Sequence, residues 1–67
     1  MIDCEIYQRR SGSYGCRIGS LMDAGYGIYY DHETEKFDVL NPDDEPIARD
    51  ATRKEAERAI LEDWKSK

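Results

Sequence analysis

The sequence has few of the residues that bind transition metals or carry out nucleophilic catalysis. It contains one histidine, His32, and two cysteines, Cys4 and Cys16, with no C-x-x-C or H-x-x-x-H pattern. Structural zinc needs four ligands, usually in two close pairs, and a catalytic nucleophile needs a base held beside it. We therefore expect no metal, no cofactor and no enzymatic activity.

Long apolar stretches are also missing. No run approaches the roughly 20 apolar residues of a membrane-spanning helix, and residues 1–5 lack the basic and apolar regions of a signal peptide. Small secreted domains usually carry more cysteines than two. We expect a cytoplasmic protein that does not contact a membrane. Its cysteines, Cys4 and Cys16, are expected to be buried free thiols, with a diagonal disulfide between them as the alternative.

The length of the chain limits what it can contain. Its 67 residues have room for one domain, residues 1–67. A chain of this size buries only about 60% of the surface that its unfolded form exposes, and it keeps little core volume for an internal cavity. This favours a module that works through its surface over a self-sufficient enzyme.

The first part of the chain has the pattern of a β-hairpin. Apolar residues recur at every second position over residues 2–8 and again over residues 14–18, which is the period of a strand with one buried face. Residues 10–13 lie between them and include Gly12, which can take a positive φ in a turn. Both cysteines fall on the inward face of this hairpin.

A second hairpin is specified more strongly, because its turn and its apolar pattern agree on one register. Asp31 can bond forward to backbone N–H groups of the turn, and Glu35 falls where a left-handed residue is needed. Gly27 indicates a bulge or a close approach within the first strand. The register pairs Asp31 with Lys36, Tyr30 with Phe37, Tyr29 with Asp38 and Ile28 with Val39.

The connecting segments are less regular. Residues 19–25 join the hairpins, and we expect Leu21 and Met22 in this segment to pack against the core. Residues 41–46 contain two prolines and several Asn and Asp residues, which are typical of a loop. Residues 47–49 are a candidate for a short additional strand.

A helix is predicted at the C-terminal end of the sequence. Thr52 and Glu55 have the spacing of a capping box, and Ala56, Ile60 and Trp64 follow on one face of the helix. We expect Ile60 and Trp64 to pack on the inward residues of the second hairpin. The predicted fold is α+β: an antiparallel sheet of about four strands in two hairpins, with a candidate fifth strand and one helix on one face.

Negative charge is concentrated in the middle of the sequence. The net charge is −5, but residues 21–50 contain nine acids and two bases, which gives −7, while residues 1–20 and 51–67 each carry +1. Such asymmetry bears on binding partners more than on the fold.

The sequence favours a non-enzymatic protein-binding module of the adaptor or inhibitor type. Tyrosine and arginine are enriched at binding hot spots, and an acidic block speeds encounter with a basic surface. In size and charge the chain is similar to the small acidic inhibitors that bacteriophages make, some of which act as nucleic-acid mimics. The predicted protein-binding residues are Tyr7, Arg17, Tyr29, Asp31, Glu33, Lys36 and Asp38.

Two alternatives remain open. Arg9, Arg10 and Arg17 could form a basic patch on the first hairpin that binds nucleic acid through phosphate contacts, although the acidic middle segment disfavours this. The other alternative is a structural subunit whose open strand edges assemble it into a homodimer or larger homo-oligomer. The sequence is compatible with a monomer or a homodimer.

Overall fold

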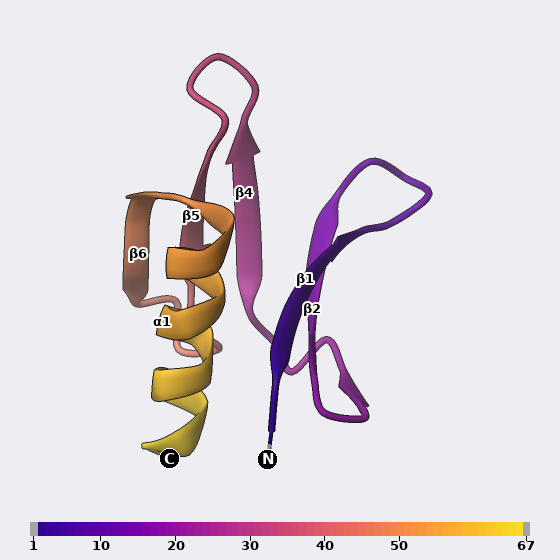
Figure 1. Ribbon diagram of the computed structural model, residues 1–67, viewed down its shortest axis with the longest axis vertical. Coiled ribbons are helices and arrows are strands. Elements are labelled where there is room, and N and C mark those ends of the chain that lie inside the picture. Colours follow the sequence, from indigo (N-terminus) through magenta and orange to yellow (C-terminus); the bar gives the residue numbers. More distant parts are fainter. Residues whose placement is uncertain (1, 67) are drawn as a thin grey trace.

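Six strands and one helix make up the fold (Figure 1). The computed structural model describes residues 2–66. The strands are β1 (Cys4–Gln8), β2 (Tyr14–Ile18), β3 (Leu21–Met22), β4 (Gly27–Asp31), β5 (Lys36–Leu40) and β6 (Pro46–Ala51), and the helix is α1 (Arg53–Lys65). The sheet is antiparallel, in the order β1-β2-β4-β5-β6 with β3 beside β2. The predicted α+β class is confirmed, and the candidate fifth strand forms as β6.

Both predicted hairpins form with the expected alternation. In the first, Cys4 lies opposite Ile18 and Ile6 opposite Cys16, and Gly12 takes a φ of 96° in the turn. In the second, β4 and β5 pair in the predicted register at every position from Ile28–Val39 to Asp31–Lys36. Glu35 takes a φ of 58°, which is the left-handed conformation that the turn requires.

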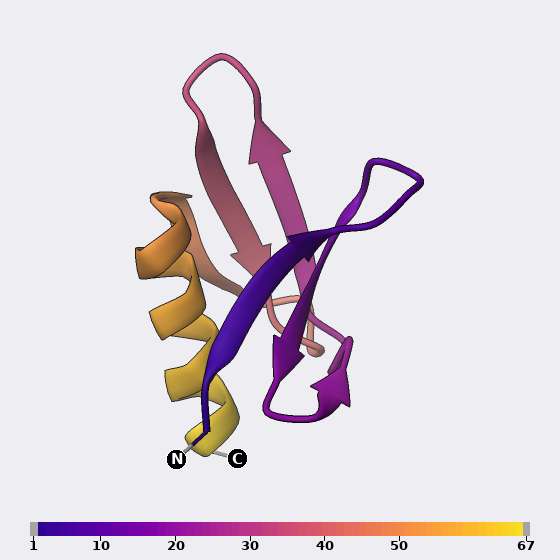
Figure 2. The ribbon, with the colours of Figure 1, turned by 45° about the vertical axis from the view of Figure 1, so that its right-hand side comes forward.

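Within residues 2–66, the strands of the two hairpins pair at a single position. A single pair, Tyr14 with Ile28, joins β2 to β4, and beyond it the hairpins diverge (Figure 2). The sheet curls, so that α1 packs against β1 on one side and against β5 and β6 on the other. Contacts with α1 therefore contribute strongly to holding the two hairpins together.

The core lies between the inner face of the sheet and the helix. Ile60, Ala56 and Val39 have no exposed surface, and Ile6 and Cys16 are almost as well buried. Around them lie the other buried apolar residues, which are Ile18, Tyr26, Ile28, Phe37 and Ala51. Residues of both hairpins and of the helix contribute to this one cluster, whose burial is the main favourable term in folding.

The helix begins at the predicted capping box. The Glu55 N–H donates to Thr52 Oγ1 at 3.2 Å, and the Thr52 N–H donates to Glu55 Oε1 at 2.9 Å. These bonds satisfy two N–H groups that a helix start otherwise leaves without partners. The bond from the Thr52 backbone lowers the pKa of the Glu55 carboxyl.

The last turn of the helix lies at the opposite end of the second hairpin from Tyr30 and Phe37. The buried Tyr26 hydroxyl, just before β4, donates to Asp63 Oδ2 at 2.6 Å, and Asn41, just after β5, also reaches Asp63. Burial, reinforced by this carboxylate, raises the pKa of Tyr26. Trp64 is half-buried and packs against the core cluster, of which Ile60 and the inward residues Ile28, Phe37 and Val39 are members.

The prediction for the connection between the hairpins was wrong. Leu21 and Met22 do not pack inward; they are 44% and 53% exposed. Gly19, with a φ of 61°, turns the chain back directly after β2, so that Leu21 and Met22 pair with Ile18 and Arg17 as β3. The side chains of β3 extend the sheet at its rim and remain in solvent.

Candidate protein-binding surface

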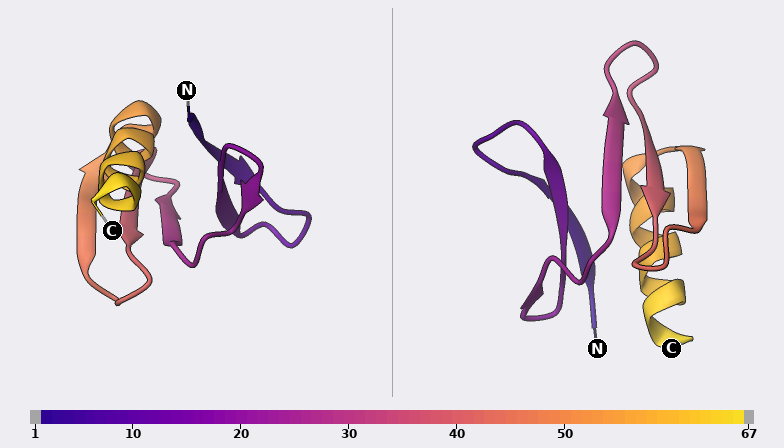
Figure 3. Two further views of the ribbon diagram at one scale, coloured as in Figure 1. Left: turned by 90° about the horizontal axis from the view of Figure 1, so that it is seen from below. Right: turned by 180° about the vertical axis from the view of Figure 1, so that it is seen from behind.

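The outer face of β4 and β5 is turned away from the helix (Figure 3, right). Tyr29, which is exposed and lies opposite Asp38, belongs to this face. Among residues 2–66 it is the most exposed large apolar side chain, with 59% of its surface accessible. Its ring covers Gly27, where an added Cβ would meet the ring at 3.4 Å. The glycine at position 27 predicted a bulge or a close approach, and the contact with the Tyr29 ring is such a close approach. Gly27 supports one side of the ring, and the other side faces solvent.

The hairpin turn next to Tyr29 presents acidic side chains. Asp31 Oδ1 accepts from the Glu33 N–H at 2.8 Å, and the Asp31 carbonyl accepts from the Glu35 N–H at 2.7 Å. These bonds fix the turn, so that Glu33 and Glu35 project into solvent. Residues 27–40 contain four acids and one lysine, a net charge of −3 with His32 neutral.

Two shallow hollows flank Tyr29. One runs toward the turn, and its lining comprises Tyr29, Tyr30, Asp31, His32, Glu33 and Asp38. The other runs toward β6 and includes Leu40, Pro46, Ala48 and Arg49 beside Tyr29 and Asp38. The hollow on the turn side is acidic and aromatic, whereas the β6 side is largely apolar with one arginine.

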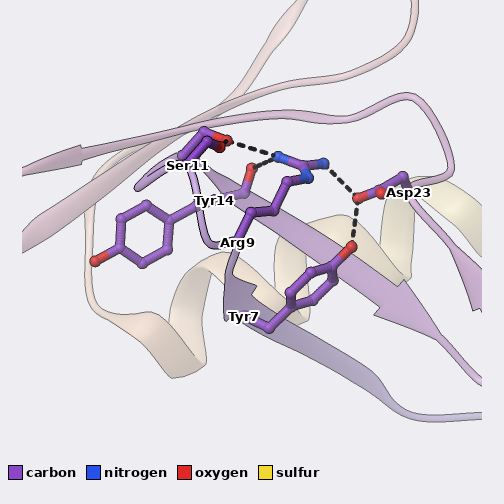
Figure 4. Close-up of polar contacts among 6 residues, drawn as sticks. Tyr7, Arg9, Ser11, Tyr14 and Asp23 are labelled. Carbon is purple, nitrogen blue, oxygen red and sulfur yellow. Dashed lines mark hydrogen bonds and ion pairs between the residues drawn. The ribbon is translucent and has the colours of Figure 1, made fainter.

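The outer face of the first hairpin is occupied by contacts within the protein (Figure 4). Asp23 Oδ1 accepts from the Tyr7 hydroxyl at 2.9 Å and forms an ion pair with Arg9 at 2.5 Å. A second guanidinium nitrogen of Arg9 donates to the Tyr14 carbonyl at 2.6 Å. The bond to Asp23 raises the pKa of Tyr7. We call Tyr7, Arg9 and Asp23 the polar clamp.

Gly15 in β2 makes the polar clamp possible. A Cβ at this position would collide with Asp23 Oδ1 and with the Arg9 guanidinium. Because Gly15 is also the residue opposite Tyr7, the absence of a side chain here leaves room for Arg9 and Asp23 to lie directly over the strand. The sequence contained this signal, an unexplained glycine in a strand facing a tyrosine.

Ion pairs engage two of the three arginines of the predicted basic patch. Arg9 is paired with Asp23, and Arg17 lies 3.3 Å from Glu5. Arg10 is exposed in the turn. Two of the three arginines thus have their charge balanced by a neighbouring carboxylate.

The structure brings four of the seven predicted binding residues together around one hollow: Tyr29, Asp31, Glu33 and Asp38. Lys36 is the cross-strand neighbour of Asp31. The remaining two, Tyr7 and Arg17, belong to the first hairpin and are engaged with Asp23 and Glu5. We call the set Tyr29, Asp31, Glu33, Lys36 and Asp38 the Tyr29 face.

Sequence reasoning missed two residues that line the same hollow, Tyr30 and His32. Alternation placed Tyr30 on the inward face, and its ring does contact Phe37 and Tyr14 at centroid distances of 4.9 and 5.3 Å. The His32 ring packs edge-on against Tyr30 at 5.0 Å. Both residues line the hollow at the end of β4, where the described part of the chain shows no pairing with β2 beyond Tyr14–Ile28.

The two cysteines are free thiols on the inner face of the first hairpin; Cys16 is buried as expected, whereas Cys4 is only partly buried. The interaction between the two thiols raises the pKa of Cys4 and lowers that of Cys16. They are diagonal neighbours across the β1–β2 pair, a relation that usually leaves Cβ atoms farther apart than a disulfide allows.

Residues 2–66 include no group of three or more His, Cys, Asp or Glu side chains placed to hold a metal ion. The helix in this part of the chain is neither long nor apolar enough to cross a membrane.

No protein-family model, curated protein or solved structure matches the chain.

Proposed function

We propose that this chain is a non-enzymatic protein-binding module of the adaptor or inhibitor type, which binds a basic surface of its partner through the Tyr29 face. The observation that carries the proposal is the exposure of Tyr29 among carboxylates. A large aromatic ring, held in place but open to solvent, has the properties of a binding hot spot. The surrounding acids supply charge complementarity, which guides encounter and orientation.

The contacts on the two hairpins support this surface over the first hairpin. The side chains of Tyr29, Glu33 and Lys36 form no hydrogen bond or ion pair within residues 2–66. Their side chains are therefore available without breaking an internal contact. Tyr7 and Arg9, in contrast, would first have to leave Asp23.

The test is a pull-down from lysate of the source cells with three forms of the protein. The wild type is compared with a Tyr29→Ala, Asp38→Lys variant and with Met22→Ala, a matched control that truncates another exposed apolar residue away from the Tyr29 face. We expect a partner that wild type and control retain and that the double variant loses. Loss of a hot-spot tyrosine alone should weaken binding by about 30-fold, or roughly 2 kcal/mol.

Identical partners for all three forms would contradict the proposed surface. A gel-shift assay at about 50 mM salt, where phosphate binding is tight, separates this function from nucleic-acid binding. We expect no shift, because carboxylates already balance Arg9 and Arg17. A shift that weakens steeply with salt and is lost in an Arg10→Ala variant would favour the nucleic-acid alternative.

A further inference from the structure

We propose that the open edge of β4 binds an extended segment of the partner as an added strand, with basic side chains on its outer side and apolar ones on its inner side. The inference rests on the proposed function, because it names how the partner engages this hairpin and what chemistry the engaged segment has.

The two outer edges of the sheet are poorly suited to strand addition. At β1, the Ile6 N–H donates to Glu57 Oε2 of the helix at 2.8 Å. At the other end, β6 begins with Pro46, which has no N–H, and its register with β5 shifts twice. Asp50 in β6 takes a φ of 51°. Blocked and irregular edges of this kind are how proteins prevent uncontrolled strand pairing.

The edge of β4 that faces the first hairpin has no such protection. The Asp31 carbonyl accepts from the Glu35 N–H and so points toward β5. Since backbone groups alternate in direction along a strand, those of Ile28 and Tyr30 point the other way, toward β2. Ile28 is paired there with Tyr14, but the pairing of β2 with β4 consists of that one pair. Tyr30 therefore presents its N–H and C=O at an open edge.

The surface beside Tyr30 is hollowed at this edge. Hollows lie on both sides of this edge, and Tyr29, Tyr30 and His32 line both of them. The second hollow is bounded on its far side by Gly12 and Ser13 of the first hairpin. An added strand would thus lie between the diverging hairpins of Figure 2, with alternate side chains entering the two hollows. This is the arrangement in which strand addition gains both affinity and specificity.

Charge selects the occupant. Asp31, Glu33 and Asp38 line the outer hollow, so outward side chains of the added strand meet carboxylates and are best served by lysine or arginine. On the inner side, the Tyr14 and Tyr30 rings, 5.3 Å apart, favour apolar side chains. A second copy of this chain is disfavoured, because edge-to-edge pairing would bring two acidic hairpins, each with a net charge of −3, against each other.

The experiment uses a short acetylated peptide of alternating lysine and valine as the probe. It is titrated into the isotope-labelled full chain and followed by backbone amide NMR shifts. Two controls share its length: a peptide of alternating glutamate and valine, and one in which lysines and valines stand in separate blocks. We expect shifts concentrated at residues 28–32 with the alternating lysine peptide and none with either control.

A second series replaces single peptide N–H groups by N-methyl groups. In an added strand only alternate N–H groups bond to the edge, so N-methylation should weaken binding at every second position, by about fivefold for a net loss near 1 kcal/mol. An effect that is the same at all positions would show that the peptide docks through side chains alone and would overturn strand addition.

The remaining outcomes separate this inference from the proposed function. Failure of the alternating lysine peptide to bind, or shifts elsewhere on the protein, would overturn strand addition, while the pull-down with the Tyr29 variant still decides the proposed surface. Self-association of the free chain that depends on Tyr30 would identify a second copy as the occupant and would overturn it as well. If the peptide still bound at residues 28–32 of a Tyr29→Ala variant, strand addition at the edge of β4 would be supported, and Tyr29 would not be the side chain that anchors the partner.

Discussion

The two hairpins have similar lengths and similar polar residues on their outer faces, but these residues make different contacts in each hairpin. On β1 and β2, Tyr7 and Arg9 are tied to Asp23 above Gly15. On β4 and β5, the Tyr29 side chain rests on Gly27 and makes no polar contact within residues 2–66. A tyrosine on a sheet face is thus part of a polar network in one hairpin and available in the other, although Asp38 beside Tyr29 does accept from the Asp50 N–H at 2.8 Å.

The difference has a physical origin in the connections that follow each hairpin. Asp23 takes a φ of 52° directly after β3, and its carboxylate returns over the first hairpin. After β5 the chain turns toward β6 instead, where Asn41 Oδ1 accepts from the Asp43 and Glu45 N–H groups. In the part of the chain that the structure describes, no comparable residue folds back over Tyr29, which stays exposed.

The largest effect is expected from removing the side chain that holds both hairpins to the helix. Ile60 has no exposed surface, and Ile60→Ala should reduce the free energy of unfolding by about 2–5 kcal/mol. This approaches the whole stability of roughly 3–5 kcal/mol expected for a chain of this size. Urea unfolding measures it, with Ile60→Val as the milder variant, expected to cost about 0.5–1.5 kcal/mol. Equal, small losses for both would contradict the central role of the helix.

A smaller loss is expected when the first hairpin loses its bond to the helix. Glu57→Ala removes the acceptor of the Ile6 N–H and should cost about 1.5–3 kcal/mol, the range for hydrogen bonds to charged groups. Glu57→Gln keeps an acceptor and should recover much of this loss. Glu62→Ala, on the exposed side of the helix, is the matched control and should change stability little. If Glu57→Ala matched this control, the bond would not stabilise the protein.

The two strand glycines provide the sharpest comparison of the hairpins. Gly15→Ala places a methyl group where the Arg9–Asp23 pair lies, and displacing that pair should cost about 1 kcal/mol. Gly27→Ala meets the Tyr29 ring only at ordinary contact distance, and should be neutral or stabilise by about 0.5 kcal/mol, because glycine weakens a strand. Thermal unfolding of both variants measures the difference. The reverse order of stabilities would be evidence against the polar clamp.

The smallest effect is expected in the pH dependence of stability, through the carboxyl group at the start of α1. This helix packs against both hairpins. The Glu55 pKa is lowered by its bond to the Thr52 backbone, so its contribution is present above the unfolded value of about 4.3 and is lost as the pH falls through the folded value. Glu55→Gln should therefore flatten the dependence of stability on pH in this acidic range. An unchanged acid-unfolding profile would show that the capping carboxylate contributes nothing measurable.

Elements with a local signal could be predicted from the sequence. The register of β4 with β5 follows from the agreement of turn and apolar pattern, and it correctly placed Tyr29 outside and Tyr30 inside. The helix start followed from Thr52 and Glu55. These features depend on residues within a few positions of one another, where period and capping chemistry are decisive.

Features that depend on distant contacts could not be predicted. The polar clamp joins Arg9 to a residue 14 positions away, and β3 depends on where Gly19 reverses the chain. For the candidate surface, alternation identified Tyr29 and Asp38, but not the part played by His32 or the open edge at Tyr30. How far two strands pair before they diverge is set by the twist and packing of the whole sheet, which the local pattern does not contain.

Amide hydrogen exchange of the free protein, followed by NMR at single residues, tests the account most directly. Ile28 and Tyr30 face the same side of β4, and Ile6 faces the helix. We predict that the N–H groups of Ile28 and Ile6 exchange slowly and that Tyr30 exchanges faster than either by about tenfold or more. If Tyr30 were protected as strongly as Ile28, the edge of β4 would already be paired, and the second hairpin would be as closed as the first.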